Sequence, residues 1–166
     1  ERRFDKNASV FKDWRHDTPE RLAACCEHDF QHWKLDKFVK AEEKRAKIIE
    51  TVTRHMGTLK ALHTYYASCS INPGYPYMSE LEYGSFLKKL KIQDKDFYKG
   101  IEFKGTMQKG VDGAQDNQLI RFQFVELVIR LSLAWNKNAG GGLSEAEAVQ
   151  AFIENEVIPK TQDIVE

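Results

Sequence analysis

The fold is decided by the stretch Asp112–Leu131, which reads DGAQDNQLIRFQFVELVIRL. Its first part, up to Gln118, is polar and rich in Asp, Asn and Gln, of which Asp and Asn favour turns. From Leu119 to about Trp135, apolar residues recur at the spacing of one helix face. This layout predicts a polar loop that leads directly into an amphipathic helix.

The composition of the 166-residue chain is ordinary for a globular domain, with 42% hydrophobic and 30% charged residues. Its 25 Lys and Arg residues equal its 25 Asp and Glu residues. The chain therefore lacks the basic surplus of a general nucleic-acid binder, and charge gives it no attraction to an anionic membrane. No apolar run in the sequence is long enough to span a bilayer. Three cysteines, two of them adjacent, favour reduced thiols and a cytoplasmic protein.

The N-terminal part of the chain predicts an irregular arm followed by two helical segments. Residues 1–17 show no sustained period, and their aromatic side chains are expected to dock on their own domain because burial is favourable. Thr18 and Pro19 have the residue types of an N-cap and a first helical position. A long helical pattern then runs from residue 38 to residue 66.

Helix signals also follow one another in the second half of the chain. Ser79 and Ser144 each precede a Glu by three residues and predict capping boxes. Asp94 is expected to cap a further helix, and the glycines at 140–142 to end the helix that starts near Leu119. Pro159 is expected to limit the last helix. No run of alternating strand residues appears, so the prediction is an all-α fold.

The loop and helix at 112–131 resemble those of a calcium-binding EF-hand. In that family, loop positions 1, 3, 5 and 12 supply oxygen ligands, position 6 is Gly, and an apolar residue at position 8 pairs with the partner loop. With Phe124 just after position 12, Asp112 takes position 1, Asp116 position 5 and Leu119 position 8. Asn117 takes position 6, where it can adopt the left-handed conformation that Gly provides.

The ligand positions of this loop predict that calcium binding has been lost. Ala114 stands at position 3 and offers no side-chain oxygen. Gln123 stands at position 12 and offers one neutral oxygen where the family has a bidentate Glu. If calcium does bind, the resemblance makes Asp112, Asp116 and Gln123 its ligands. No other cofactor is expected.

The same register fits a second loop upstream, with Glu82 at position 12 and Met78 at position 8. Positions 1, 3 and 5 of this loop hold no carboxylate, since they are Ile71, Pro73 and Tyr75. Glu82 is explained by the capping box, and no calcium is expected here. Met78 and Leu119 are then expected to form the short antiparallel bridge between the two loops.

The resemblance implies a degenerate EF-hand pair with a long preceding helix and an extra C-terminal helix. The expected parts are an N-terminal arm and helix (1–47), the helix–loop–helix pair (48–137), and a hinge with the C-terminal helix (138–166). They are expected to form one compact domain of a larger protein. The strings at 77–92 and 119–135, YMSELEYGSFLKKLKI and LIRFQFVELVIRLSLAW, also look like an EF-hand-related domain of large protist proteins, often flagellar or cytoskeletal.

The resemblance further implies a protein-binding module. EF-hand pairs form an apolar cup that suits an amphipathic helix. The expected lining of this cup is Met78, Phe86, Leu119, Phe122, Phe124, Leu127 and Leu131. Without calcium to open it, the cup is expected to be filled by the terminal helix of the same chain, with a protein partner bound elsewhere. A basic patch at Lys88, Lys89 and Lys91 is a candidate contact for an acidic partner or a cytoskeletal component.

Two alternative functions stay open: a calcium sensor that uses the loop at 112–123, and an oligomerising scaffold in which the 38–66 helix pairs between chains. No nucleophile-elbow, Walker or kinase motif is present, so no catalytic residue and no enzyme is predicted. His28 and His32, with Cys25, have the spacing of zinc ligands on one helix, but a fourth ligand is not evident and a structural role is favoured. The expected setting is the cytoplasm, and the resemblance adds the cytoskeleton and the flagellum or cilium.

Overall fold

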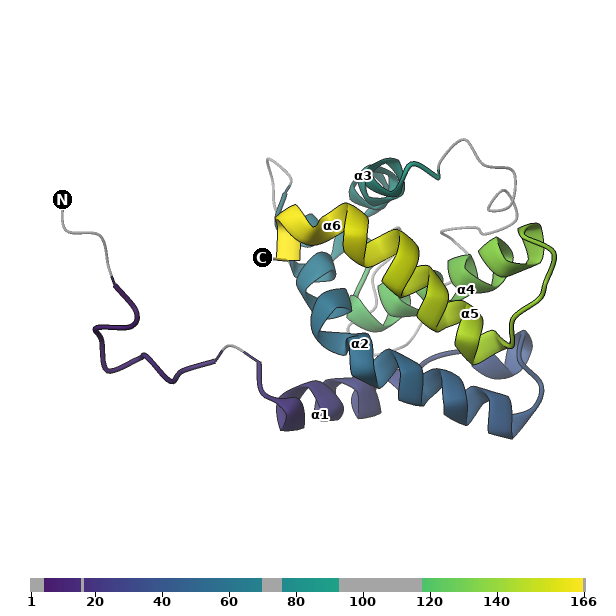
Figure 1. The fold of residues 1–166 in the computed structure, drawn as a ribbon, viewed down its shortest axis with the longest axis horizontal. Coiled ribbons are helices and arrows are strands. Elements are labelled where there is room, and N and C mark those ends of the chain that lie inside the picture. Colours follow the sequence, from purple (N-terminus) through teal and green to yellow (C-terminus); the bar gives the residue numbers. More distant parts are fainter. Residues whose placement is uncertain (1–4, 16, 70–75, 93–117, 166) are drawn as a thin grey trace.

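Helices account for most of the described chain, which confirms the predicted all-α fold (Figure 1). The computed structural model describes residues 5–15, 17–69, 76–92 and 118–165. In chain order its helical elements are α1 (Pro19–Phe30), the 3-10 turn η1 (Leu35–Lys37), α2 (Glu42–Ser68), α3 (Glu80–Leu90), α4 (Arg121–Asn138), α5 (Glu145–Phe152), the π-helical segment η4 (Ile153–Val157) and α6 (Ile158–Val165). Two short strands, β1 (Met78–Ser79) and β2 (Gln118–Leu119), pair antiparallel. The predicted helix after Asp94 and the polar loop before β2 lie outside the described residues.

Local capping starts three of the helices where the sequence predicts. Thr18 accepts a hydrogen bond at Oγ1 from the backbone N–H of Arg21, and Pro19 opens α1. Ser79 and Ser144 each form a complete capping box with the Glu three residues later. These bonds satisfy backbone donors that a helix start otherwise leaves unpaired.

The long helix α2 begins at Glu42, later than the predicted start at residue 38. Arg45 reaches back from its first turn and donates through Nη1 to the carbonyl oxygens of Val39, at 2.9 Å, and Lys40, at 2.7 Å. These bonds hold the chain in a non-helical conformation just before the helix. α2 then crosses the expected boundary between residues 47 and 48 without interruption, so the N-terminal and central parts of the chain share one helix.

Pro159 does not end the last helix, contrary to the prediction. The helix continues as α6 to Val165, directly after the π-helical segment η4. At the end of η4, the backbone N–H of Ile158 bonds to the carbonyl of Ile153, five residues earlier. A proline in a regular α-helix clashes with the carbonyl four residues before it. The wider π turn relieves that clash, and the chain stays helical.

The two strands form the predicted bridge between the loops. Met78 pairs with Leu119, and Ser79 pairs with Gln118. His63 on α2 also holds the bridge, because its Nε2–H donates to the carbonyl oxygen of Leu119 at 3.0 Å. The bridge therefore connects α3 to α4 and is itself anchored to α2.

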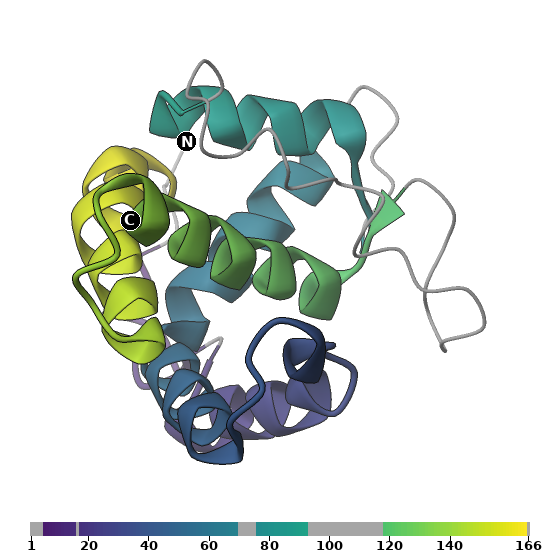
Figure 2. The same cartoon turned by 90° about the vertical axis from the view of Figure 1, so that its right-hand side faces the viewer.

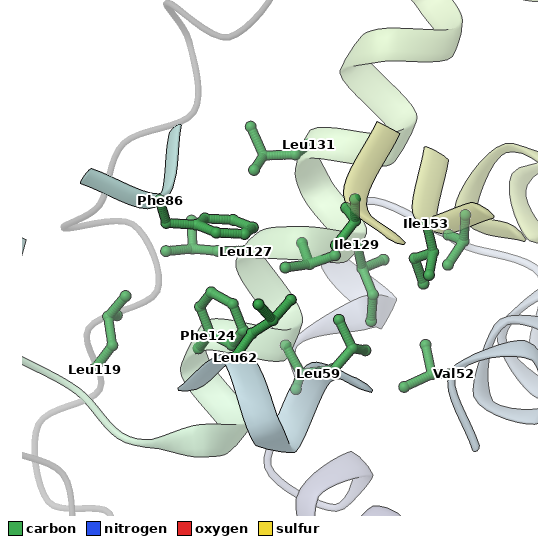
Figure 3. Packing of buried hydrophobic residues seen from close by; sticks show 14 of the residues in the cluster. Val52, Leu59, Leu62, Phe86, Leu119, Phe124, Leu127, Ile129, Leu131 and Ile153 are labelled. Carbon is green, nitrogen blue, oxygen red and sulfur yellow. The ribbon is translucent and has the colours of Figure 1, made fainter. Parts of the chain in front are cut away.

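One hydrophobic core joins helices from both ends of the chain (Figure 3). Ile153 in η4 lies in the same buried cluster as Phe86 of α3 and Phe124 of α4. Figure 2 shows α5 and α6 lying beside α2 and α4, while α1 packs on the other side of α2. The terminal helix of the same chain thus covers the apolar face of α4, as expected.

The N-terminal arm (residues 5–15) does not dock on its own domain, contrary to expectation. It extends away from the helical body (Figure 1). Phe11 is 57% exposed and Trp14 is 56% exposed. The core is complete without these two rings, because Trp33 and Phe122 occupy the side of the fold where α1 meets α4.

Candidate functional site

Gln123, the one predicted calcium ligand among the described residues, is fully buried and already has a hydrogen-bond partner. Its Oε1 accepts a hydrogen bond from the backbone N–H of Ile120 at 2.9 Å, at the start of α4. Glu82 does the same at the start of α3, where its Oε2 accepts from the N–H of Ser79 at 2.6 Å. Both side chains at the twelfth loop position therefore act as helix caps. Asp112 and Asp116 lie outside the described residues.

The seven side chains expected to line an apolar cup are all core residues in this structure. Phe122 is 2% exposed and the other six have no exposed surface. The six are Met78, Phe86, Leu119, Phe124, Leu127 and Leu131. Their apolar surface is used within the chain, so a partner needs a different surface.

A buried ion pair and a tryptophan connect the N-terminal helix region to the start of α4. Asp29, 1% exposed, accepts two hydrogen bonds from Arg121, at 2.7 Å from Nε and 2.8 Å from Nη2. The indole N–H of Trp33 donates to the carbonyl oxygen of Phe122 at 2.9 Å. The two bonds between Asp29 and Arg121 make a bidentate pair, which is the strong form of a carboxylate–guanidinium contact.

Beside this ion pair lies a small pocket of about 150 Å³, with several titratable side chains in its wall. His28, Lys60 and His63 line it together with Asp29 and Arg121. Burial lowers the pKa of His63, so its ring is neutral at neutral pH. The pocket is smaller than the roughly 300–1,000 Å³ of ordinary ligand sites. Its charges are also engaged in pairs, since Lys60 binds Asp17 and Arg121 binds Asp29.

Glu126 on α4 is the other buried acid with a distinct environment. Its Oε1 accepts from the backbone N–H of Lys34 at 2.5 Å, and its Oε2 has no hydrogen-bond partner among the described residues. Arg130 approaches to 3.8 Å but also lies over the ring of Phe38. Burial raises the pKa of the Glu126 carboxyl. These contacts tie the start of η1 to α4.

The histidines considered as zinc ligands pack against other rings. The rings of His28 and His32 are tilted by 57° with their centroids 5.1 Å apart, and the centroid of the His32 ring lies 5.0 Å from that of Phe122. His28 also contacts the Asp29 carboxylate through Nδ1 at 3.0 Å. Within the described ranges no group of three or more His, Cys, Asp or Glu side chains is placed to hold a metal ion. The favoured structural role accounts for their contacts.

An open groove of about 470 Å³ lies between α2, α3 and α6 and is here called the outer groove. Its lining includes Tyr65 and Tyr66 from α2, Cys69 directly after α2, Leu81 and Lys88 from α3, and Ile164 from α6. Leu81 is 81% exposed and Tyr65 is 44% exposed, and the two share the lining of one groove. Tyr66 lies deeper, and burial raises its pKa to about 12, so its hydroxyl stays protonated.

The predicted basic patch forms one edge of the outer groove. Lys88 and Lys89 both line it. Lys89 binds Asp163 of α6 at 2.7 Å, which closes the groove at one point of its rim. Lys91 is exposed and ends α3 in the left-handed conformation, with φ of 57°. Two of the three predicted basic residues thus come together with apolar side chains that sequence reasoning did not single out.

Tyr65, Cys69 and Leu81 were missed because the groove is built from three separate helices. Leu81 alone offered a signal, since it is a large apolar residue on the polar side of the α3 pattern, followed by the core residues Phe86 and Leu87. An apolar side chain at such a position marks a candidate contact surface.

Comparison of the chain with models of known protein families, with curated proteins and with solved structures gave no match. Across the described ranges, no helix combines the length and the apolar character needed to cross a membrane.

Proposed function

We propose that this chain is a non-enzymatic protein-interaction module, with an EF-hand-like helix–loop–helix pair that has lost calcium binding. The observation that carries the proposal is the contrast between two apolar surfaces. The inner one, on α4, is covered by α5 of the same chain. The outer groove, with Leu81 81% exposed, is open. An open apolar groove with a charged edge is the usual form of a protein-binding surface.

The EF-hand-like part of the proposal is supported by the arrangement of the two loops. In each unit a short strand leads into a helix, β1 into α3 and β2 into α4. The two strands pair through Met78 and Leu119. Each following helix is capped by the side chain three residues into it, Glu82 or Gln123. This equivalence of two units is what a pair of related helix–loop–helix motifs implies.

The side chains do not fit a calcium ion. Calcium takes six to eight oxygen ligands, usually with a bidentate carboxylate at the last loop position. Gln123 has no carboxylate, and its amide oxygen accepts the N–H of Ile120. Ala114 has no side-chain oxygen. The calcium-sensor alternative would require both deficits to be offset by other ligands.

The partner that suits the outer groove is a protein segment with apolar side chains beside carboxylates. Tyr65 and Leu81 supply the apolar surface, and Lys88 supplies positive charge at the edge. A cytoskeletal or flagellar partner in the cytoplasm remains part of the proposal through the sequence resemblance. Pairing of α2 helices between chains has less support, because α2 buries its apolar side chains Val52, Met56 and Leu59 within the fold.

Calcium independence is tested by thermal melting with and without the ion. We expect the Tm of the chain to be the same in chelator and in millimolar calcium, whereas a rise of several degrees would favour the calcium sensor. The double variant Ala114→Asp, Gln123→Glu restores two ligand types and serves as the positive control. A calcium-dependent rise in the variant alone supports an EF-hand-like loop that has lost its ligands, and the absence of a rise in both removes that support.

The interaction role is tested with matched surface variants. Leu81→Glu places a charge in the outer groove, and Leu143→Glu places the same charge at another exposed leucine, which is 41% exposed. Both variants should fold normally because neither side chain is in the core. We expect Leu81→Glu, and not Leu143→Glu, to lose the proteins that co-purify with the wild-type chain. Equal capture by all three proteins would contradict a binding role for the groove.

A further inference from the structure

The N-terminal arm carries apolar side chains that its own fold leaves in water. Val10 is 92% exposed, Phe11 57% and Trp14 56%. Exposed aromatic side chains on a projecting segment are a strong driving force for contact, because each buries about 150–250 Å² when docked. The arm is therefore a candidate ligand as well as a part of the chain.

The arm has a defined shape despite its exposure. Consecutive turns are closed by backbone hydrogen bonds from Ser9 to Lys6, from Lys12 to Ser9 and from Trp14 to Phe11. The ammonium group of Lys6 donates to the carbonyl oxygen of Trp14 at 2.7 Å and lies 5.9 Å from the centre of its ring. A segment that is already ordered loses less conformational entropy when it binds.

The base of the arm is fixed to the body, and the arm leaves in the outward direction. Asp17 forms an ion pair with Lys60 on α2, and Thr18 caps α1. From this base, residues 5–15 project away from the helices (Figure 1). Docking onto the same chain would require the arm to change this direction. Docking onto a second copy would keep both the turns and the outward direction.

The outer groove offers the complementary surface. Its volume of about 470 Å³ falls within the range of sites that hold a ligand of side-chain size. It exposes Tyr65 and Leu81 for contact with aromatic rings. Asp13, next to Trp14 in the arm, is an acidic residue that can pair with Lys88 at the edge of the groove.

We propose that the outer groove of one copy of this chain receives Phe11 and Trp14 from the arm of a second copy. The exchange is reciprocal, because each copy has one arm and one groove, and a two-fold pair satisfies both. The inference rests on the proposed function of the groove as a protein-binding site, and it names the occupant. Two small contacts of this kind bury on the order of 1,000 Å² together, which places the dimer among weak, concentration-dependent assemblies.

Cys69, an exposed thiol in the groove, provides a direct test. The variant Lys12→Cys places a second thiol between Phe11 and Trp14 without removing either ring, in a Cys25→Ser background that removes the other accessible thiol. With oxidised glutathione as the oxidant, we expect a disulfide-linked dimer on a non-reducing gel. The further change Cys69→Ser should abolish it, and Trp14→Ala should reduce its yield by about tenfold or more, equivalent to the loss of one good apolar contact.

Each outcome decides the matter. A dimer that depends on both Cys69 and Trp14 supports arm exchange. A monomer closed by the disulfide would show that the arm fills its own groove, and it would overturn exchange between copies. A dimer yield equal to that of the Cys69→Ser control would also overturn exchange. If cross-linking fails while Leu81→Glu still abolishes capture of another protein, the arm proposal falls and the interaction role of the groove stands. If cross-linking succeeds and capture is unaffected, the groove serves self-association instead.

Discussion

The ion pair between Asp29 and Arg121 gives the sharpest test of how the chain is organised. Asp29 lies at the end of α1 and is 1% exposed, whereas the Arg121 side chain at the start of α4 is 25% exposed. The variant Asp29→Leu fills a similar space and leaves the guanidinium without its carboxylate. If α1 belongs to the same cooperative unit as α4, this change must lower the free energy of unfolding of the whole chain.

The magnitude follows from burial. Removing one partner of a fully buried pair costs about 3–5 kcal/mol. Because a quarter of the Arg121 side chain remains in contact with water, we expect a smaller loss than this range, about 2–3 kcal/mol. For a chain of this length, that loss corresponds to a fall in Tm of about 4–12 °C. The double variant Asp29→Leu, Arg121→Met leaves no unpaired charge and should recover about 2 kcal/mol relative to the single change.

Urea unfolding, followed by circular dichroism and by tryptophan fluorescence, measures the free energy of unfolding of the single and the double variant. The chain has three tryptophans, so the fluorescence is followed in a Trp14→Phe, Trp135→Phe background. Trp33 is 7% exposed and bonds to α4, so its emission then reports whether the N-terminal helices leave before the rest. Coincident transitions with the stated loss support a single unit. The reasoning would be refuted if Asp29→Leu changed the free energy of unfolding by less than about 0.5 kcal/mol, or if the double variant were merely additive.

Three further predictions follow from single residues. Gly57 lies inside α2, where an added Cβ would be 3.4 Å from the flexible end of Leu22, so Gly57→Ala should raise the free energy of unfolding by up to about 1 kcal/mol in urea titrations. Glu126 has a raised pKa in the fold, so the folded state holds its proton to a higher pH than the unfolded state. The free energy of unfolding must therefore fall as pH rises above about 4.5. In Glu126→Gln, the Tm measured against pH should not show this fall. His63 has a lowered pKa, so the unfolded chain takes up the proton first and stability must fall as pH drops below about 6.5; His63→Gln, which keeps a donor for Leu119, should show a flatter Tm between pH 5.5 and 6.5, and an unchanged slope would contradict the assignment.

Local features of the fold could be predicted because they depend on contacts between residues a few positions apart. The caps at Thr18, Ser79 and Ser144 form within one helical turn, and the structure confirms all three. The prediction that Pro159 ends the last helix was wrong, although it also concerned residues a few positions apart. A π turn can absorb the proline, but nothing in the residue types nearby announces that η4 will adopt one.

One long-range feature was also predictable, and it came from the register of the loops. The pairing of Met78 with Leu119 follows once Phe124 and Tyr83 are aligned as equivalent residues. By contrast, the contact of Asp29 with Arg121 joins residues far apart in the chain and has no counterpart in any repeated pattern. The same is true of the bond from Trp33 to the carbonyl of Phe122.

The sequence alone determined that the chain is helical, where several helices start, and that Leu119–Leu131 is an apolar face in need of cover. It did so because helix periodicity and capping are properties of neighbouring residues. Only the tertiary structure decided how completely the expected terminal helix covers it. The packing of α5 onto α4 turned the expected cup into core, and the meeting of α2, α3 and α6 created the outer groove. Surfaces that form between distant helices depend on relative position in space, which no local pattern of residues encodes.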